Sequence, residues 1–195
     1  MRIAEKSRKT KETDIRIKIN LDGKGGSSID TGLPFLDHMF ELFAKHSLID
    51  LEISAKGDLD IDAHHTIEDL GIVFGTILKE AAGDKIGIKR YGWSYLPMDE
   101  SLARVVVDFS GRPYLVYKVK TSTKEAGTIN VRLFHEFFQA LSVNAGMNLH
   151  IELLYGEEVH HIFEAIFKGF AKAISQALTI DKNIEGVLST KGTLN

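Results

Sequence analysis

The chain has 195 residues, 44% of them hydrophobic and 26% charged, so it is long enough for one domain with a packed core. Its 24 basic and 27 acidic residues leave a net charge of −3, which gives no argument for binding nucleic acid or an anionic membrane. The absence of cysteine excludes disulfides, thiolate metal ligands and a cysteine nucleophile. No apolar run reaches the roughly 18 residues of a membrane span, and no signal peptide is recognisable, so we expect a cytoplasmic protein.

The first half of the chain predicts two strands, a helix, a strand and a long helix. Residues 14–23 (DIRIKINLDG) alternate between polar and apolar, and a short strand candidate, GSSIDTG, follows at 26–32. Residues 36–47 are rich in aromatic side chains at helical spacing, and residues 49–54 (IDLEIS) alternate again. A long amphipathic helix is predicted to begin near His64, with apolar positions at Ile67, Leu70, Val73, Phe74 and Ile77.

The second half repeats this order. Strand candidates at 103–112 (ARVVVDFSGR) and 113–119 (PYLVYKV) precede a helical pattern at 134–146 and the alternating strand NLHIEL at 148–153. The closing helix has apolar positions at Ile162, Ile166, Phe167, Phe170, Ala173 and Ile174. Residues 84–100 are interpreted as the connection between the halves, and the polar tail after Asn183 contains STKG at 189–192.

An internal repeat supports this organisation. HHTIE at 64–68 and HHIFE at 160–164 lie 96 residues apart, and the segments before them align at an offset of 98, which sets Leu51 on Leu149. We therefore expect a single α+β domain over residues 1–195, built from two ββαβα halves with helices packed on one face of each sheet. The halves span about 1–84 and 85–183, and a C-terminal tail follows.

The repeated HHxxE pattern points to metal binding. On a helix, His64 and Glu68 share a face, whereas the adjacent rings of His64 and His65 point about 100° apart. Two neighbouring histidines therefore favour two metal ions, each bound by one imidazole. A single HHxxE motif is also explained by a polar surface turn, but two such motifs at equivalent places in the two halves favour metal binding.

The repeat also predicts further ligands. At the offset of 98, His38 corresponds to Glu136, with His135 as the alternative one position away. Imidazoles with a few carboxylates suit a borderline divalent ion such as Mn, Fe, Co, Ni or Zn. The candidate ligands are His38, His64, His65, Glu68, Glu136, His160, His161 and Glu164.

Basic side chains provide candidates for holding an anionic substrate. Ser189, Thr190 and Lys191 together offer hydroxyls and an ammonium group that could bind an oxyanion. Each basic residue taken alone is also explained as a surface charge. The basic substrate-binding candidates are Arg90, Arg112, Lys168 and Lys191, with Ser189 beside the last.

Several long motifs resemble the imidazoleglycerol-phosphate dehydratase family. They are PFLDHM (34–39), DAHHTIEDLGI (62–72), NLHIELLYGEEVHH (148–161) and the terminal STKG. The resemblance implies a histidine-biosynthesis enzyme that dehydrates imidazole glycerol phosphate to imidazole acetol phosphate. It also implies a duplicated fold similar to the second domain of a ribosomal protein, two Mn²⁺ ions per subunit, and a 24-subunit assembly with sites shared between neighbouring subunits.

The resemblance implies roles for individual residues. The metal ligands fall on the histidines and glutamates proposed above, and the eighth falls on Glu136, where several relatives carry histidine. Glu12 matches the family's catalytic glutamate. The residues that match the family's phosphate-holding positions are Arg90, Arg112, Ser189 and Lys191.

This reaction demands more than a single base. The proton to be removed is not beside a carbonyl, so the imidazole ring must serve as the electron sink, and a metal on each ring nitrogen would stabilise an imidazolate. Glu12 is the candidate for proton transfer. Two alternatives remain at this point. One is a dinuclear metallohydrolase, whose ions lie about 3.5–4 Å apart. The other is a non-catalytic metal-binding shell, which needs no general base.

Overall fold

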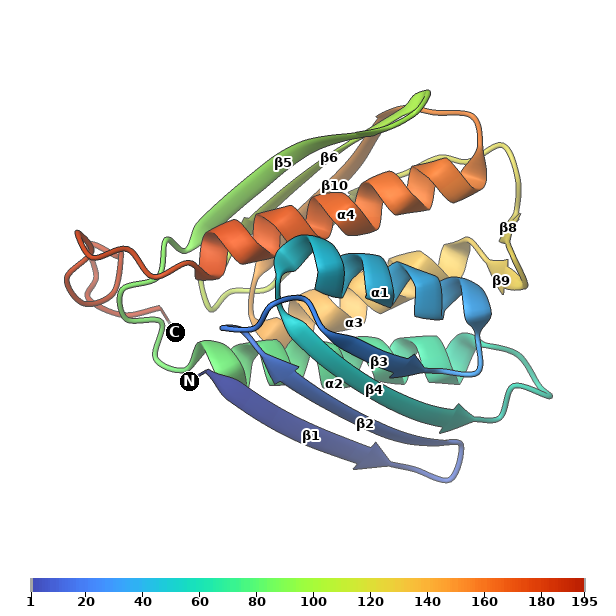
Figure 1. Ribbon diagram of the computed structural model, residues 1–195, viewed down its shortest axis with the longest axis horizontal. Coiled ribbons are helices and arrows are strands. Elements are labelled where there is room, and N and C mark those ends of the chain that lie inside the picture. Colours follow the sequence, from blue (N-terminus) through green and yellow to red (C-terminus); the bar gives the residue numbers. More distant parts are fainter. Residues whose placement is uncertain (1, 195) are drawn as a thin grey trace.

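Two four-stranded sheets enclose a layer of four helices in the computed structural model, which describes residues 2–194 (Figure 1). The first sheet has the order β1-β2-β4-β3 and the second the order β5-β6-β10-β7. The strands of the first sheet are β1 (Ile3–Lys9), β2 (Thr13–Asn20), β3 (Ser27–Asp30) and β4 (Asp50–Gly57). Those of the second are β5 (Tyr91–Met98), β6 (Ser101–Asp108), β7 (Tyr114–Lys118) and β10 (Asn148–Tyr155).

The helices are α1 (Pro34–Ser47), α2 (His64–Ala82), α3 (Arg132–Ala145) and α4 (Val159–Leu178). A small hairpin of β8 (Glu125–Ala126) and β9 (Ile129–Asn130) precedes α3. In both sheets one pairing is parallel: β3 pairs in parallel with β4 in the first sheet, and β7 with β10 in the second. The other pairings in the two sheets are antiparallel. This shared topology confirms the duplicated α+β fold with helices on one face of each sheet.

Apart from the β8–β9 hairpin, each half has one strand more than the ββαβα interpretation, because β1 and β5 were not predicted. The element order is therefore βββαβα twice, and the supposed connection at 84–100 contains β5. Both strands lie at a sheet edge. The side chains of β1 are almost all exposed, so they show no alternation. In β5 the aromatic side chains face outward, and inward Gly92 lets α4 approach; a Cβ on it would lie 1.9 Å from the Ala173 carbonyl oxygen.

The predicted helix faces form the core between the sheets. All of the apolar positions predicted for α2 and α4 are buried. The phenylalanines of the four helices pack against one another, for example Phe40 on Phe74 and Phe137 on Phe167, with ring centroids 5.6 and 6.1 Å apart. Phe43 on Phe170 joins α1 to α4, and Phe74 on Phe137 joins α2 to α3, with ring centroids 5.3 and 6.3 Å apart. Residues at the ends of these helices are therefore held at fixed positions. Within residues 2–194, no helix has both the length and the apolarity that a bilayer span requires.

Candidate metal centres and phosphate site

Three predicted ligands from two helices meet in one cluster. His38 lies on α1, and His160 and Glu164 lie one turn apart on α4. The Nε2 atoms of both imidazoles are 3.0 Å from Oε1 of Glu164. One potential ligand atom from each residue lies within 4.8 Å of the others, which is the spacing a single metal ion needs. The packing of α1 on α4 thus joins residues that are 126 positions apart.

Glu164 is the most buried member of this cluster. Its side chain is only 10% exposed, and Lys168 Nζ donates a hydrogen bond to Oε2 at 2.5 Å. Burial raises the pKa of Glu164, but the hydrogen bonds from Lys168 and His38 outweigh it and lower the pKa to about 2. The carboxylate is therefore ionised at neutral pH, and Oε1 faces the two imidazoles. Lys168, predicted to bind substrate, pairs with a candidate ligand in this chain.

A second group forms between α2 and α3. His64 Nε2 lies 3.6 Å from Glu68 Oε2, one turn along α2. Glu136 of α3 lines the same hollow as His64. His135 lines a different hollow beside Tyr117 and Phe163, and its Nδ1 lies 3.2 Å from Glu136 Oε1. This arrangement favours Glu136 over His135 as the ligand, with His135 hydrogen-bonded to it.

His65 and His161 lie outside both clusters. Nδ1 of His65 is 2.9 Å from Asp58 Oδ2, and Nδ1 of His161 is 2.7 Å from Glu100 Oε2. These hydrogen bonds raise the pKa of both imidazoles. A carboxylate on Nδ1 fixes the ring and directs Nε2 to a ligand, as in many histidine metal sites.

The sequence did not reveal Asp58 and Glu100 as partners of these histidines. Asp58 follows β4 and precedes His65 by seven residues, whereas Glu100 belongs to the β5–β6 turn and precedes His161 by 61. They occupy different places in the two halves, so the repeat could not indicate them. Only a search for carboxylates near each ligand helix in three dimensions finds both.

Glu12 lies at the end of the β1–β2 turn, beside His65. Its Oε2 is 3.9 Å from His65 Nδ1, and the side chain is 55% exposed. The structure therefore places the candidate base beside one of the two histidines that join neither cluster.

The candidate phosphate-binding residues line one hollow at the other end of the molecule. Arg90, Arg112, Ser189 and Lys191 contribute to it together with Ser110. Arg90 forms two hydrogen bonds with Asp108, at 2.7 and 3.1 Å, which raise its pKa, and it donates to the Leu188 carbonyl at 2.8 Å. Arg90 thus anchors the C-terminal tail that carries Ser189 and Lys191.

The fold and these clusters define a class of protein: an α+β domain of two similar halves, with candidate histidine–carboxylate metal sites at the starts of matched helices and a separate candidate anion site. The family model described as imidazoleglycerol-phosphate dehydratase matches residues 31–174. The chain is 56% identical to imidazoleglycerol-phosphate dehydratase of Geobacter sulfurreducens over 187 residues, covering 96% of each chain. It is 55% identical to that of Acetivibrio thermocellus, covering 97% of each.

Solved structures agree. The crystal structure of imidazoleglycerol-phosphate dehydratase from Staphylococcus aureus N315 aligns with a TM-score of 0.83 and 46% identity, covering 92% of this chain and 99% of that one. The enzyme from Pyrococcus furiosus, in complex with (S)-C348, aligns with a TM-score of 0.83 and 37% identity, covering 97% and 100%.

The chain belongs to the imidazoleglycerol-phosphate dehydratase family. It is a lyase that removes water from imidazole glycerol phosphate to give imidazole acetol phosphate in histidine biosynthesis. The family is metal-dependent, and the histidine–glutamate cluster on α1 and α4 is a candidate metal site.

Proposed function

We propose that the chain performs this dehydration with two Mn²⁺ ions per subunit, in the cytoplasm. One ion is assigned to His38, His160 and Glu164, and the other to His64, Glu68 and Glu136. The observation that carries the proposal is the close approach of two imidazoles to the ionised Glu164 carboxylate. Nitrogen and carboxylate donors in one cluster suit a borderline divalent cation. The relatives' role in bacterial biosynthesis supports the cytoplasmic location.

Each proposed site has three ligands from one chain, which leaves a place for a fourth. His65 and His161 are predicted ligands that join neither cluster, and each has its Nδ1 hydrogen-bonded to a carboxylate. We assign their Nε2 atoms to the sites of neighbouring copies. This exchange requires an oligomer with sites at subunit interfaces, and the assembly proposed for it is the homo-24-mer that the resemblance implies.

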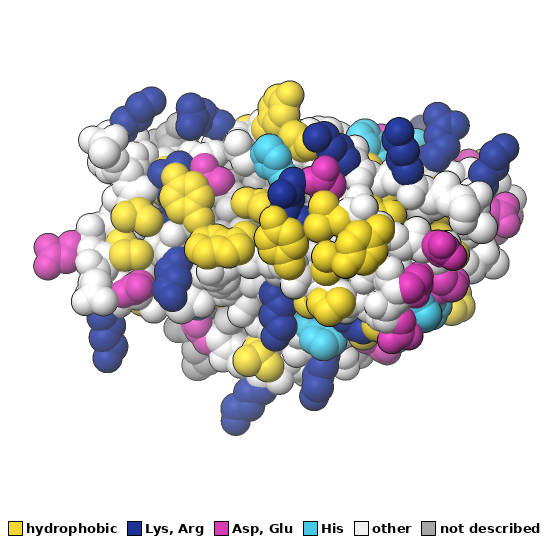
Figure 2. Space-filling model, turned by 90° about the horizontal axis from the view of Figure 1, so that it is seen from above, with side chains coloured by type: hydrophobic (Ala, Val, Ile, Leu, Met, Phe, Trp, Pro, Cys, Tyr) yellow, Lys and Arg dark blue, Asp and Glu magenta, His cyan; other side chains and the backbone are white. Residues whose placement is uncertain are grey.

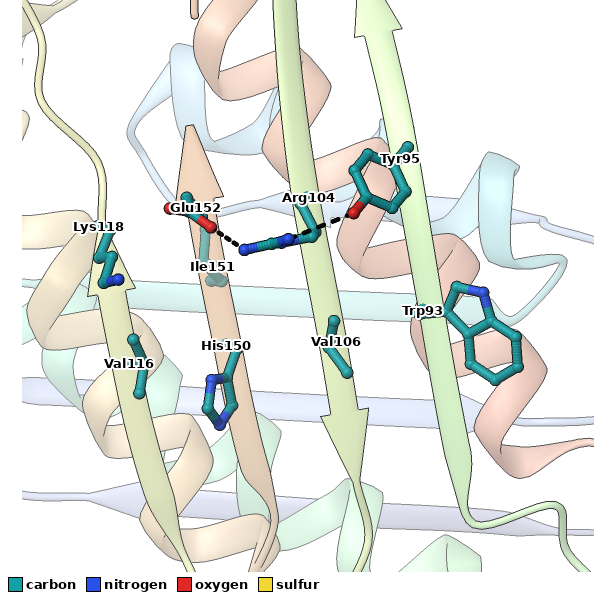
Figure 3. Close-up of a pocket in the computed structure, with 9 residues that line it drawn as sticks. All are labelled: Trp93, Tyr95, Arg104, Val106, Val116, Lys118, His150, Ile151 and Glu152. Atoms are coloured by element: carbon teal, nitrogen blue, oxygen red, sulfur yellow. Dashed lines mark hydrogen bonds and ion pairs between the residues drawn. The ribbon is translucent and has the colours of Figure 1, made fainter. Parts of the chain in front are cut away.

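The outer face of the second sheet supports association between copies. Strand register sets its side chains in two rows, which Figure 3 shows side by side: Trp93, Val106, His150 and Val116, then Tyr95, Arg104, Glu152 and Lys118. Trp93 and Tyr95 are each 58% exposed. Figure 2, which looks onto this side of the molecule, shows the hydrophobic side chains gathered across it. Exposed apolar surface of this kind typically marks a protein–protein contact.

The first sheet provides an internal comparison. At the equivalent row its outer face carries Glu5, Lys18 and Glu52, and Lys18 Nζ pairs with Glu52 at 3.0 Å. Two sheets of the same topology thus have a charged and an aromatic outer face. We assign the aromatic face to contact with another copy of this chain, because Arg104 and Glu152 form an ion pair there and leave little unbalanced charge at the centre of the face.

The reaction also needs a group that transfers a proton and residues that bind the substrate's phosphate group. When bound, the cations supply Lewis acids that make the substrate's imidazole ring an electron sink. Glu12 accepts the proton from the glycerol carbon next to the one that loses its hydroxyl group. Because Glu12 lies beside His65, it enters the neighbour's site together with that histidine. Arg112 and Lys191 bind the phosphate, and Arg90 holds the tail in place.

Glu12→Gln and His160→Ala test the chemical assignment. Glu12→Gln should keep Mn²⁺ and assembly while losing most dehydration, since a general base typically contributes about 10²–10⁴-fold. His160→Ala should lose one of the two Mn²⁺ ions per subunit, measured by elemental analysis of the purified protein. Full activity of Glu12→Gln, or unchanged metal in His160→Ala, would contradict the proposal.

Trp93→Glu tests the assembly. A charge within the aromatic face should leave smaller species in light scattering after gel filtration. Lys18→Ala, on the outer face of the first sheet, is the matched control and should keep the mass of the wild type. An unchanged mass for Trp93→Glu would exclude this face as the contact.

A further inference from the structure

We propose that Asp69 is a positioning residue for Glu12. Its carboxylate fastens the β1–β2 turn to helix α2, so that the carboxylate of Glu12 stays free for proton transfer. The inference rests on the proton-transfer role proposed for Glu12 above. Asp69 directly follows the predicted ligand Glu68 on α2, yet none of the functions described so far uses it.

Asp69 holds both strands of the hairpin at once. It is 8% exposed, and its two oxygens have different partners. Oδ1 accepts a hydrogen bond from Arg8 Nε at 2.9 Å, near the end of β1. Oδ2 accepts one from the hydroxyl of Thr13 at 2.5 Å, at the first residue of β2. A buried carboxylate with both oxygens paired is firmly held and costly to disturb.

The hydrogen bonds continue from Asp69 to the backbone of Glu12. Oγ1 of Thr10 accepts the backbone N–H groups of Glu12 and Thr13, at 3.0 and 2.9 Å. It also lies 3.2 Å from Oγ1 of Thr13. Because the hydroxyl proton of Thr13 is directed to Asp69, the Thr10 hydroxyl must donate to Thr13. An unbroken chain of polarised hydrogen bonds therefore connects Asp69 to the amide of Glu12.

The second half of the molecule fastens its turn differently. Glu100 occupies the place of Glu12, directly before the second strand of its hairpin. Its Oε1 accepts the backbone N–H groups of Glu157 and Glu158 at 3.2 and 3.0 Å, and its Oε2 is 2.7 Å from His161 Nδ1. These hydrogen bonds hold the pKa of Glu100 far below its usual value. Both carboxylate oxygens of Glu100 thus anchor the β5–β6 turn to α4 and its N-terminal loop.

One difference between the halves lies directly after the ligand glutamate. Where α2 has Asp69 after its ligand glutamate, α4 has Ala165 after Glu164. In the first half Asp69 anchors the turn, and Glu12 remains 3.9 Å from His65, beyond hydrogen-bond distance. The half with the additional carboxylate is therefore the half whose turn glutamate can act as a base.

Fixing the turn to α2 also sets the distance between base and ligands. His65 and Glu12 are held by the same helix, one directly and one through Asp69. Loss of this anchor lets the base drift while the ligands stay in place. A misplacement of about 1 Å at a catalytic group can cost on the order of 10²-fold in rate.

Asp69→Asn and Thr13→Val test the inference in the Mn²⁺-loaded assembled enzyme. Both should lower kcat by about 10–100-fold, with KM, Mn²⁺ content and assembly mass within about twofold of the wild type. Thr13→Ser keeps the hydroxyl and should restore most of kcat. The matched control is Lys9→Ala, which removes the exposed Lys9–Asp14 pair of the same hairpin and should leave kcat unchanged.

A double variant separates positioning from a general structural role. If Asp69 acts through Glu12, adding Asp69→Asn to Glu12→Gln should lower kcat no further than Glu12→Gln alone. The inference would be overturned if the kcat losses of the two single variants multiplied in the double variant. It would also be overturned if Asp69→Asn and Thr13→Val both kept kcat within twofold of the wild type, or if either variant lost Mn²⁺. Full activity of Glu12→Gln would overturn the proposed base and this inference together. An inactive Glu12→Gln with an active Asp69→Asn would overturn the inference alone.

Discussion

Gly71 and Gly75, one turn apart on α2, let that helix lie directly on α3. A Cβ built on Gly71 would be 2.5 Å from the Phe137 carbonyl oxygen and 3.0 Å from the Ala140 Cβ. Ordinary contact begins at 3.4 Å, so Gly71→Ala requires α2 and α3 to separate by about 0.9 Å at this point. The obstacle is backbone of the neighbouring helix, which cannot rotate away as a flexible side chain can.

Two free-energy terms of opposite sign decide the outcome. Alanine in a helix interior is favoured over glycine by about 1 kcal/mol. Overpacking of a tight core typically costs about 1–3 kcal/mol. We expect Gly71→Ala to be less stable than the wild type despite its better helix propensity. For a domain of this size, each kcal/mol shifts the melting temperature by roughly 2–4 °C.

Gly169→Ala is the matched control. It also places a methyl group at a glycine inside a helix, but that Cβ meets the side chains of Ser94 and Val105, each at 3.1 Å. These side chains can yield by a few tenths of an ångström, so the propensity gain should largely offset the crowding. Gly71→Ala should therefore melt below Gly169→Ala when both are measured as chelated protein at equal concentration.

The same variant connects packing to the metal sites. Phe137 directly follows Glu136, so displacement of α3 moves Glu136 relative to His64 on α2. The cluster on α1 and α4 lies elsewhere and should be unaffected. Calorimetric titration with Mn²⁺ should show weakening at one of two sites. A Gly71→Ala protein as stable as the wild type would refute the packing argument, and equal weakening of both sites would refute the division of ligands.

Two further predictions concern acid stability and the phosphate site. Oδ1 of Asp50 accepts backbone hydrogen bonds from Lys24 and Gly26, which lower its pKa. A carboxyl with a lowered pKa stabilises the fold above its unfolded value of 3.8 and loses that contribution as the pH falls. Asp50→Asn should thus cost about 1 kcal/mol near pH 6. Urea melts of chelated protein should show this gap closing as the pH falls below 3.8, and a gap independent of pH would contradict the prediction. Lys191→Ala should raise KM about tenfold with little change in kcat, and a steady-state assay in which kcat alone falls would remove Lys191 from phosphate binding.

The local chemistry of this protein could be predicted from the sequence, because it depends on short-range spacing. Helical periodicity located the buried faces of α2 and α4, and the duplicated HHxxE placed His64 and His160 at the first turns of matched helices. Edge strand β1 escaped prediction because almost all of its side chains are exposed, and β5 because its aromatic side chains lie on the outward positions, opposite to the usual pattern. An edge strand forms because of its hydrogen bonds and packing with the neighbouring strand, so its own hydrophobic pattern need not show it.

The grouping of the candidate ligands was decided only by tertiary structure. His64 and His65 are adjacent in sequence, yet one faces Glu136 and the other faces Asp58, because a helix turns successive side chains about 100° apart. Likewise Lys168 lies beside Glu164, whereas the other basic candidates line a separate hollow. The sequence by itself determined which side chains could bind a metal. Helix packing determined which of them meet, since contacts over more than 100 residues follow from how the core closes and not from spacing along the chain.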